Sequence, residues 1–164
     1  MDREPTNVDD NKTYRQVRDM LKLAQRAYRE LSDYYAKRNL ELKERRAAML
    51  VDYLQGHEEK MESVLSDTMA SISEKTLDTF YQYEPESVER ILPEVYELHF
   101  DDDAGTDEIT AKAIRFHEIM RDYYAKAEDM AGSQAVAEVF KNLKDEEVNK
   151  VQTIAQDANA LQDV

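Results

Sequence analysis

Two glutamates occupy equivalent positions in two similar segments of this sequence. Glu58 lies in LQGHEEKMESVL, residues 54–65, and Glu147 lies 89 residues later in LKDEEVNKVQTI, residues 143–154. Helical geometry places positions i, i+4, i+7 and i+11 on one face, so each carboxylate points into a face that is mostly apolar. A buried carboxylate without a partner is strongly unfavourable. We therefore expect both glutamates to bind a metal ion or to pair with cations in the core.

Four further residues fall at the same level of the expected core. Met61 and Lys150 each follow a glutamate by three residues, and Tyr28 and His117 occupy equivalent core positions in the segments before them. The predicted core polar cluster has six members: Tyr28, Glu58, Met61, His117, Glu147 and Lys150. We expect Lys150 and a protonated His117 to neutralise the two carboxylates, and Tyr28 to donate a hydrogen bond to them. The alternative is a single metal ion held by Glu58, His117 and Glu147.

An internal repeat relates the two halves of the chain. The pentapeptide DYYAK at residues 33–37 recurs without a gap at residues 122–126, again with an offset of 89 residues. Leu54 and Glu58 match Leu143 and Glu147 at the same offset. The repeat predicts that two helices of the first half duplicate two helices of the second half about a pseudo-twofold axis.

Apolar residues spaced alternately three and four apart predict four long helices. The expected ranges are about 14 to 39, about 41–44 to 81, about 107 to 130, and about 134 to 161. Residues 83–108 hold two of the three prolines and are expected to form a long crossover with a short helix over 87–92. Residues 1–12 are expected to form a flexible tail, and residues 13–164 a single domain.

This arrangement resembles the ferritin-like superfamily, particularly its rubrerythrin-like branch, over about residues 13–160. The stretch FKNLKDEEVNK, residues 140–150, looks much like a rubrerythrin fourth helix. The resemblance implies an all-α, ferritin-like antiparallel four-helix bundle built from two helical hairpins joined by a long crossover. It also implies a di-iron centre, to which each half of the bundle contributes a Glu from its first helix and a Glu-x-x-His from its second.

The residues at the metal-ligating positions depart from this family pattern. Glu58 and Glu147 match it, but Met61 and Lys150 stand where the histidines belong. The glutamate positions of the first and third helices hold Tyr28 and His117. An ammonium group repels a metal cation, so the sequence predicts a degenerate di-iron site without catalytic residues or a resident cofactor. The alternative is a rubrerythrin-type oxidoreductase or iron-handling protein that binds iron or manganese through divergent ligands, and whether the chain is an enzyme stays open.

Composition narrows the classes of partner. The net charge of −14 argues against nucleic-acid binding, which needs a basic face. The sequence has no cysteine and no apolar run of about 20 residues that could span a membrane. We expect a cytoplasmic, non-catalytic interaction or structural protein that forms a homodimer or binds a protein partner.

Aromatic and imidazole side chains outside the core are the candidates for such contacts. The chain has ten tyrosines, and Tyr34 and Tyr123 lie beside the core seam, where they are expected to line a groove or a dimer contact. His57 is expected to point sideways, toward solvent or a partner, and His99 to lie at the surface of the crossover.

Overall fold

The structure, a computed structural model, describes residues 14–82 and 90–162. This part of the chain is almost entirely helical. Its helices are α2 (Val17–Asn39), α3 (Arg45–Ser71), α4 (Glu74–Leu77), α6 (Ile91–Tyr96), α7 (Thr106–Asp129) and α8 (Gln134–Gln162). Its strands are β1 (Tyr14–Gln16) and β2 (Phe80–Gln82), which pair with each other in antiparallel orientation. The protein is therefore all-α apart from one short two-stranded ladder.

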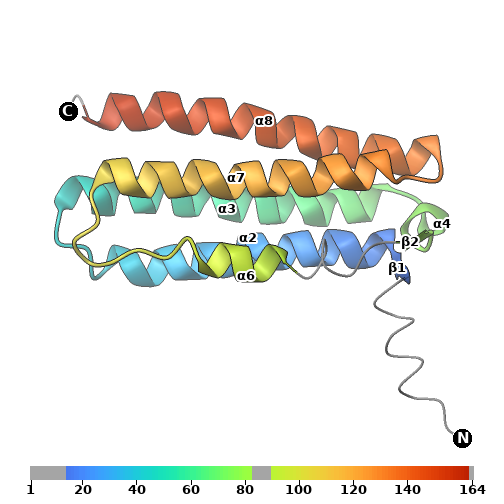
Figure 1. The fold of residues 1–164 in the computed structure, drawn as a ribbon, viewed down its shortest axis with the longest axis horizontal. Helices are drawn as coiled ribbons and strands as arrows, with labels where there is room; N and C mark the ends of the chain where they lie inside the picture. The colour runs from blue at the N-terminus through green and yellow to red at the C-terminus, as the bar shows by residue number, and fades with distance from the viewer. Residues whose placement is uncertain (1–13, 83–89, 163–164) are drawn as a thin grey trace, which may run out of the picture.

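The four long helices form two hairpins that pack against each other (Figure 1). Helices α2 and α3 run in opposite directions, and so do α7 and α8. The connection from α3 to α7 returns along the whole length of the molecule, so these two helices run in the same direction. The hairpins meet where α3 contacts α7 and α8, and where side chains of α7 reach α2.

The predicted seams form the core. On α2 the seam is buried from end to end: Val17, Leu21, Ala24, Tyr28, Leu31 and Tyr35. On α3 the buried members are Ala47, Val51, Leu54, Glu58, Met61 and Leu65. On α7 they are Ala113, His117, Met120, Tyr124 and Ala127. On α8 they are Val136, Phe140, Leu143, Glu147 and Ile154. Helical periodicity thus located much of the core and its buried Glu58, His117 and Glu147, but it missed the buried Ser32 and placed in the core Lys150, which is partly exposed.

The predicted extension of the second helix to about Tyr81 is wrong. Helix α3 ends at Ser71, and Ile72 has an extended backbone with φ of −92° and ψ of 157°. The Ser73 hydroxyl then caps the separate helix α4 by accepting a hydrogen bond from the backbone N–H of Thr76. Tyr81 itself lies in β2, opposite Arg15 in β1.

The predicted start of the first helix near Tyr14 is also wrong. Residues 14–16 form β1, and α2 begins at Val17. The pairing joins segments more than sixty residues apart, with Gln16 opposite Phe80. Local spacing of apolar residues carries no signal for such a contact, because the contact depends on where α2, α3 and α4 bring β2 relative to β1.

The crossover between α3 and α7 spans residues 72–105 rather than 83–108. Its main helix is α6, at Ile91–Tyr96 instead of 87–92, and the predicted residues 87–89 lie outside the described residues, as does the predicted tail over 1–12. The Tyr34 hydroxyl fixes the end of the crossover to α2 by donating to the carbonyl of Phe100 (3.0 Å) and accepting from its N–H (2.7 Å). His99 stacks on the Tyr34 ring, with 3.8 Å between the ring centroids.

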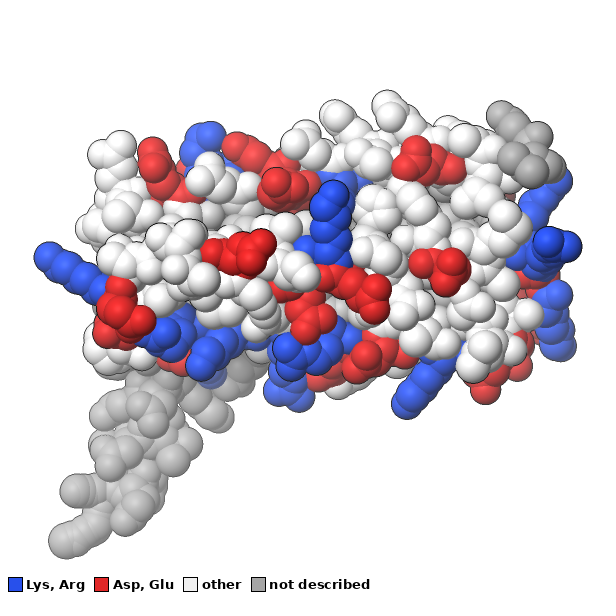
Figure 2. All heavy atoms as spheres, turned by 180° about the vertical axis from the view of Figure 1, so that it is seen from behind, with Lys and Arg blue, Asp and Glu red and all other residues white. Residues whose placement is uncertain are grey.

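Acidic and basic side chains are interspersed over the surface, as Figure 2 shows for one face. Ion pairs such as Arg29–Glu62 and Lys144–Glu128 join neighbouring helices. Within the described residues, no helix is both long and apolar enough to cross a membrane.

Candidate functional site: a buried carboxylate–imidazole–carboxylate cluster

His117 lies between two glutamates at the centre of the four long helices. Its Nε2 is 2.9 Å from Oε2 of Glu58 on α3, and its Nδ1 is 2.5 Å from Oε1 of Glu147 on α8. All three side chains are fully buried. A carboxylate can only accept hydrogen bonds, so the ring satisfies both partners when it carries a proton on each nitrogen.

The electrostatics of the cluster favour this imidazolium. Burial by itself lowers the pKa of His117, but the charges and hydrogen bonds of Glu58 and Glu147 raise that pKa to about 10. His117 is therefore positively charged at neutral pH. Burial raises the pKa of Glu58, although the neighbouring His117 opposes the change. One buried cation thus faces two carboxyl groups. The raised pKa of Glu58 favours its neutral form, which lessens the excess of negative charge in the cluster.

Two tyrosines complete the shell of Glu147. The Tyr28 hydroxyl on α2 donates to Oε2 of Glu147, and it lies 2.9 Å from the hydroxyl of Tyr124 on α7. Since Tyr28 donates its proton to the carboxylate, Tyr124 is the donor to Tyr28. Burial raises the pKa of both hydroxyls well above the ordinary value, which keeps them protonated as donors.

The contacts follow the pseudo-twofold relation that the repeat predicts. An offset of 89 residues converts Tyr28 into His117 and Glu58 into Glu147. The contact of Tyr28 with Glu147 is therefore the counterpart of the contact of His117 with Glu58, and both are present. The symmetry breaks at the second nitrogen of His117, which reaches Glu147 because an imidazole has two donors where a phenol has one.

The six residues predicted for the cluster are not all in contact. Tyr28, Glu58, His117 and Glu147 meet as described, and Met61 is fully buried on the same seam. Lys150 lies partly exposed and makes no ion pair with Glu58 or Glu147. Its predicted role as a direct partner of the carboxylates is therefore corrected: its charge only lowers the pKa of Glu58 weakly from a distance. A long alkyl stem lets such an ammonium group remain in water at the edge of a core.

Tyr124 belongs to the hydrogen-bond network although it was not among the residues predicted for the cluster. The signal was present, because Tyr124 follows His117 by seven residues and so lies two turns along the same helix face. One atom of the cluster has no partner in the described structure. It is Oε1 of Glu58, which is fully buried and accepts no hydrogen bond.

The side chains present do not fit a di-iron centre. Both nitrogens of His117 and both oxygens of Glu147 are already engaged within the cluster. Only Oε1 of Glu58 is without a partner, whereas two irons are ordinarily held by several carboxylates and two neutral imidazoles. Among the described residues, no group of three or more acidic or imidazole side chains has a geometry suited to holding a metal ion.

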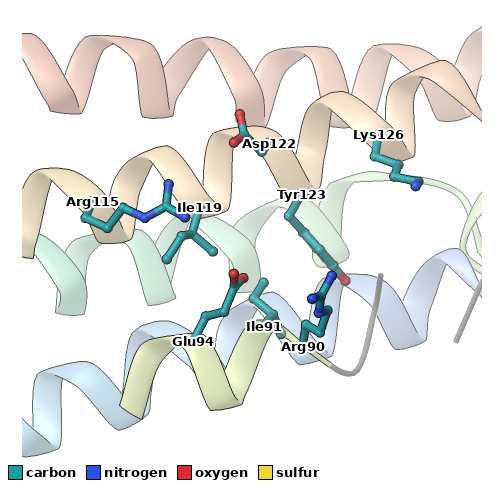
Figure 3. Close-up of a pocket in the computed structure, with 8 residues that line it drawn as sticks. All are labelled: Arg90, Ile91, Glu94, Arg115, Ile119, Asp122, Tyr123 and Lys126. Carbon is teal, nitrogen blue, oxygen red and sulfur yellow. The ribbon is translucent and has the colours of Figure 1, made fainter. Parts of the chain in front are cut away.

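A separate hollow of about 210 Å³ lies at the surface between α6 and α7. In Figure 3, Glu94 on α6 points toward Arg115 and Ile119 on α7. Tyr123 lines this hollow but is buried, and its hydroxyl donates to the carbonyl of Met20. The position of Tyr123 is thus set by packing between α7 and α2, and the two acids and three cations around the hollow largely offset one another.

Replacing Tyr28 with phenylalanine is expected to destabilise the protein by about 1–3 kcal/mol. The change removes one donor from Glu147 and leaves the Tyr124 hydroxyl without its acceptor. Urea unfolding followed by circular dichroism measures the loss. Tyr35→Phe is the matched control, because Tyr35 is equally buried on the same helix but makes neither of these hydrogen bonds. Equal destabilisation by both substitutions would contradict a role for the Tyr28 hydroxyl.

No family model, curated protein or solved structure matches this chain. Inference about its function therefore depends on the geometry and electrostatics of its own residues.

Proposed function

We propose that this chain is a ferritin-like four-helix bundle in which an ion-pair network occupies the place of a di-iron centre. In this proposal the protein acts through its surface, as a non-catalytic interaction or structural protein. The directions of the four long helices and the long crossover support the fold assignment. The paired contacts that follow the internal repeat support it further.

The observation that carries the proposal is the double engagement of His117. An imidazole ligates a metal through an unprotonated nitrogen, and both nitrogens of His117 are instead hydrogen-bonded to carboxylates. The raised pKa of His117 makes loss of either proton costly at neutral pH. The cluster therefore stabilises the core while leaving little capacity for a metal ion.

Elemental analysis of the purified chain tests this proposal. Protein from iron-supplemented cells, and protein reconstituted anaerobically with Fe(II) or Mn(II), is expected to hold far less than one metal ion per chain. Its melting temperature is expected to stay unchanged when the metal is added. Metal that stays bound near one ion per chain, and that raises the melting temperature, would contradict the proposal.

A variant with the family's six ligands restored serves as the positive control. Tyr28→Glu, Met61→His, His117→Glu and Lys150→His together place four carboxylates and two imidazoles at the centre. If the bundle is ferritin-like, this variant is expected to bind about two irons per chain, because the backbone positions then match the di-iron pattern. Failure of the folded variant to bind iron would count against the ferritin-like assignment.

A second candidate function is a metal-dependent oxidoreductase or an iron-handling protein with one divergent metal site. The observation favouring it is Oε1 of Glu58, a fully buried carboxylate oxygen without a partner beside Glu147 and His117. A metal ion there would take the place of the proton on the imidazole. Near-stoichiometric metal in the native chain that is lost in both Glu58→Ala and Glu147→Ala would establish this candidate instead.

A further inference from the structure

A groove of about 420 Å³ runs between the C-terminal half of α3 and the N-terminal half of α8. Val64 from α3 and Ile72 just after its end, together with Val139 and Leu143 from α8, contribute to its apolar lining. Its volume falls within the range of roughly 300–1,000 Å³ that is usual for binding pockets. The groove lies outside the buried cluster, so the proposed function of the centre does not account for it.

The internal repeat shows what fills the equivalent place in the other half of the molecule. An offset of 89 residues converts Asn142 and Glu146 of the groove into Tyr53 and His57 on α3. The Tyr53 ring lies between α3 and α8, where its hydroxyl donates to Asp157 on α8. His57 packs edge-on against this ring, with 4.5 Å between the centroids. An aromatic pair therefore occupies the site that is open in the second half.

The groove is thus a site at which one copy of the repeat lacks an aromatic side chain. We propose that it binds a segment of a partner protein that inserts a tyrosine side chain flanked by basic residues. The proposal rests on the function proposed above, in which the chain acts through its surface, and it names the chemistry of the partner.

The polar groups of the groove fit a phenol. Thr68 is the equivalent of Asp157, the residue that accepts the Tyr53 hydroxyl in the closed half. The Thr68 hydroxyl donates to the carbonyl of Val64 (2.8 Å), which leaves its oxygen as an acceptor. The exposed side chain of Asn142 makes no hydrogen bond to any described residue and offers both a donor and an acceptor. An inserted phenol would therefore find a hydrogen-bond acceptor, the Thr68 hydroxyl, at the position equivalent to that of Asp157.

The charges of the groove fit basic residues beside the tyrosine. Glu138 and Glu146 both line it, and neither forms an ion pair with any described residue. The whole chain carries a net charge of −14, so its field attracts cationic segments at long range. Lysine or arginine on either side of the tyrosine would neutralise the two carboxylates.

A substitution that fills the groove with a side chain of the protein itself tests the proposal. Asn142→Tyr restores the residue of the other repeat, and it is expected to fill the groove and raise the melting temperature. Asn149→Tyr makes the same exchange at an exposed position of α8 outside the groove and is the matched control. The probe is an acetylated and amidated Lys-Tyr-Lys peptide, titrated into the ¹⁵N-labelled full chain and followed by amide chemical shifts.

The expected result is a set of saturable shifts around the groove with the tyrosine peptide. A Lys-Ala-Lys peptide is expected to bind at least about tenfold more weakly, and the Asn142→Tyr protein is expected to lose the response by at least about tenfold. Asn149→Tyr is expected to respond like the native chain. Equal shifts with both peptides, or unchanged binding by the folded Asn142→Tyr protein, would overturn the proposal.

Two further measurements separate the other occupants. Tyramine that binds as tightly as the peptide would overturn the assignment to a protein segment in favour of a small phenolic amine. A concentration-dependent dimer in sedimentation that Asn142→Tyr abolishes would assign the groove to a second copy of the chain instead. Metal content is measured independently of peptide binding. A metal-free chain that ignores the peptide would refute this inference alone, and a metal-loaded chain would refute the proposed function alone.

Discussion

Replacing His117 with alanine is expected to destabilise the protein by about 3–5 kcal/mol, the usual cost of removing one partner from a buried ion pair. Without the imidazolium, two fully buried carboxyl groups from α3 and α8 face each other with no cation between them. Glu147 keeps the hydrogen bond from Tyr28, whereas Glu58 loses its one hydrogen-bond donor in the described structure. For a chain of this size, such a loss lowers the melting temperature by roughly 6–20 °C.

A rescue experiment separates lost charge from lost volume. Glu58→Gln and Glu147→Gln, introduced into the His117→Ala protein, remove both negative charges but leave the cavity unfilled. The triple variant is therefore expected to recover a large part of the lost stability if charge is the main cause. His57→Ala is the control for deleting an imidazole from the neighbouring α3, since His57 is only half-buried and forms no ion pair with Glu58 or Glu147. A loss no larger than that of His57→Ala would contradict the central role of His117.

The sequence contained enough information to locate the centre of the site. The seams on α3 and α8 placed Glu58 and Glu147 among buried apolar residues, and their burial follows from that register. The repeat placed Tyr28 and His117 at equivalent positions, and both reach the carboxylates. These features are set by spacing within one helix, which the sequence shows directly.

The choice of partners depended on geometry that spacing does not define. Lys150 follows Glu147 by three residues, which puts it on the same side of α8, but its side chain lies partly exposed instead of joining the cluster. His117 meets both carboxylates because α7 packs against both α3 and α8, and this is a relation between helices rather than within one helix. The pairing of β1 with β2 could not be predicted from spacing for the same reason, since the two strands are distant in the sequence.

The sequence shows the exchange of residues that leaves the groove open, but not the groove itself. The exchange of Tyr53 for Asn142 is visible in the repeat, but the consequence depends on the depth that α3 and α8 leave between them. On the closed side, Asp157 holds the Tyr53 hydroxyl, and that contact also required the antiparallel pairing of α3 with α8. Substitutions between repeats become interpretable when the packing of both copies is known.

Stability is expected to fall as the pH rises above about 6.5, and His117 is the main cause. The pKa of His117 is about 10 in the folded protein and about 6.5 in the unfolded chain, so the folded state holds the proton more tightly. Its contribution is fully present below pH 6.5 and is lost progressively between 6.5 and 10. The raised pKa of Glu58 acts in the same direction, because the folded state also binds that proton more tightly. Unfolding by urea at pH 6 and pH 9 is expected to differ by several kcal/mol.

Below about pH 6.5, stability is expected to fall as the pH falls, and His57 is the histidine responsible. Burial, with the nearby charge of Lys150, lowers the pKa of His57 to about 4, so the folded state favours its neutral form. The stability that His57 contributes is present above pH 6.5 and is lost as the pH falls from 6.5 to 4. Melting temperatures measured from pH 4 to 10 should therefore peak near pH 6. His117→Ala is expected to flatten the alkaline limb, and because the charge of His117 helps to lower the pKa of His57, it also reduces the acidic limb to a smaller extent. His57→Ala is expected to flatten the acidic limb and to leave the alkaline limb in place. An alkaline limb that persists unchanged in His117→Ala would contradict its assignment to His117.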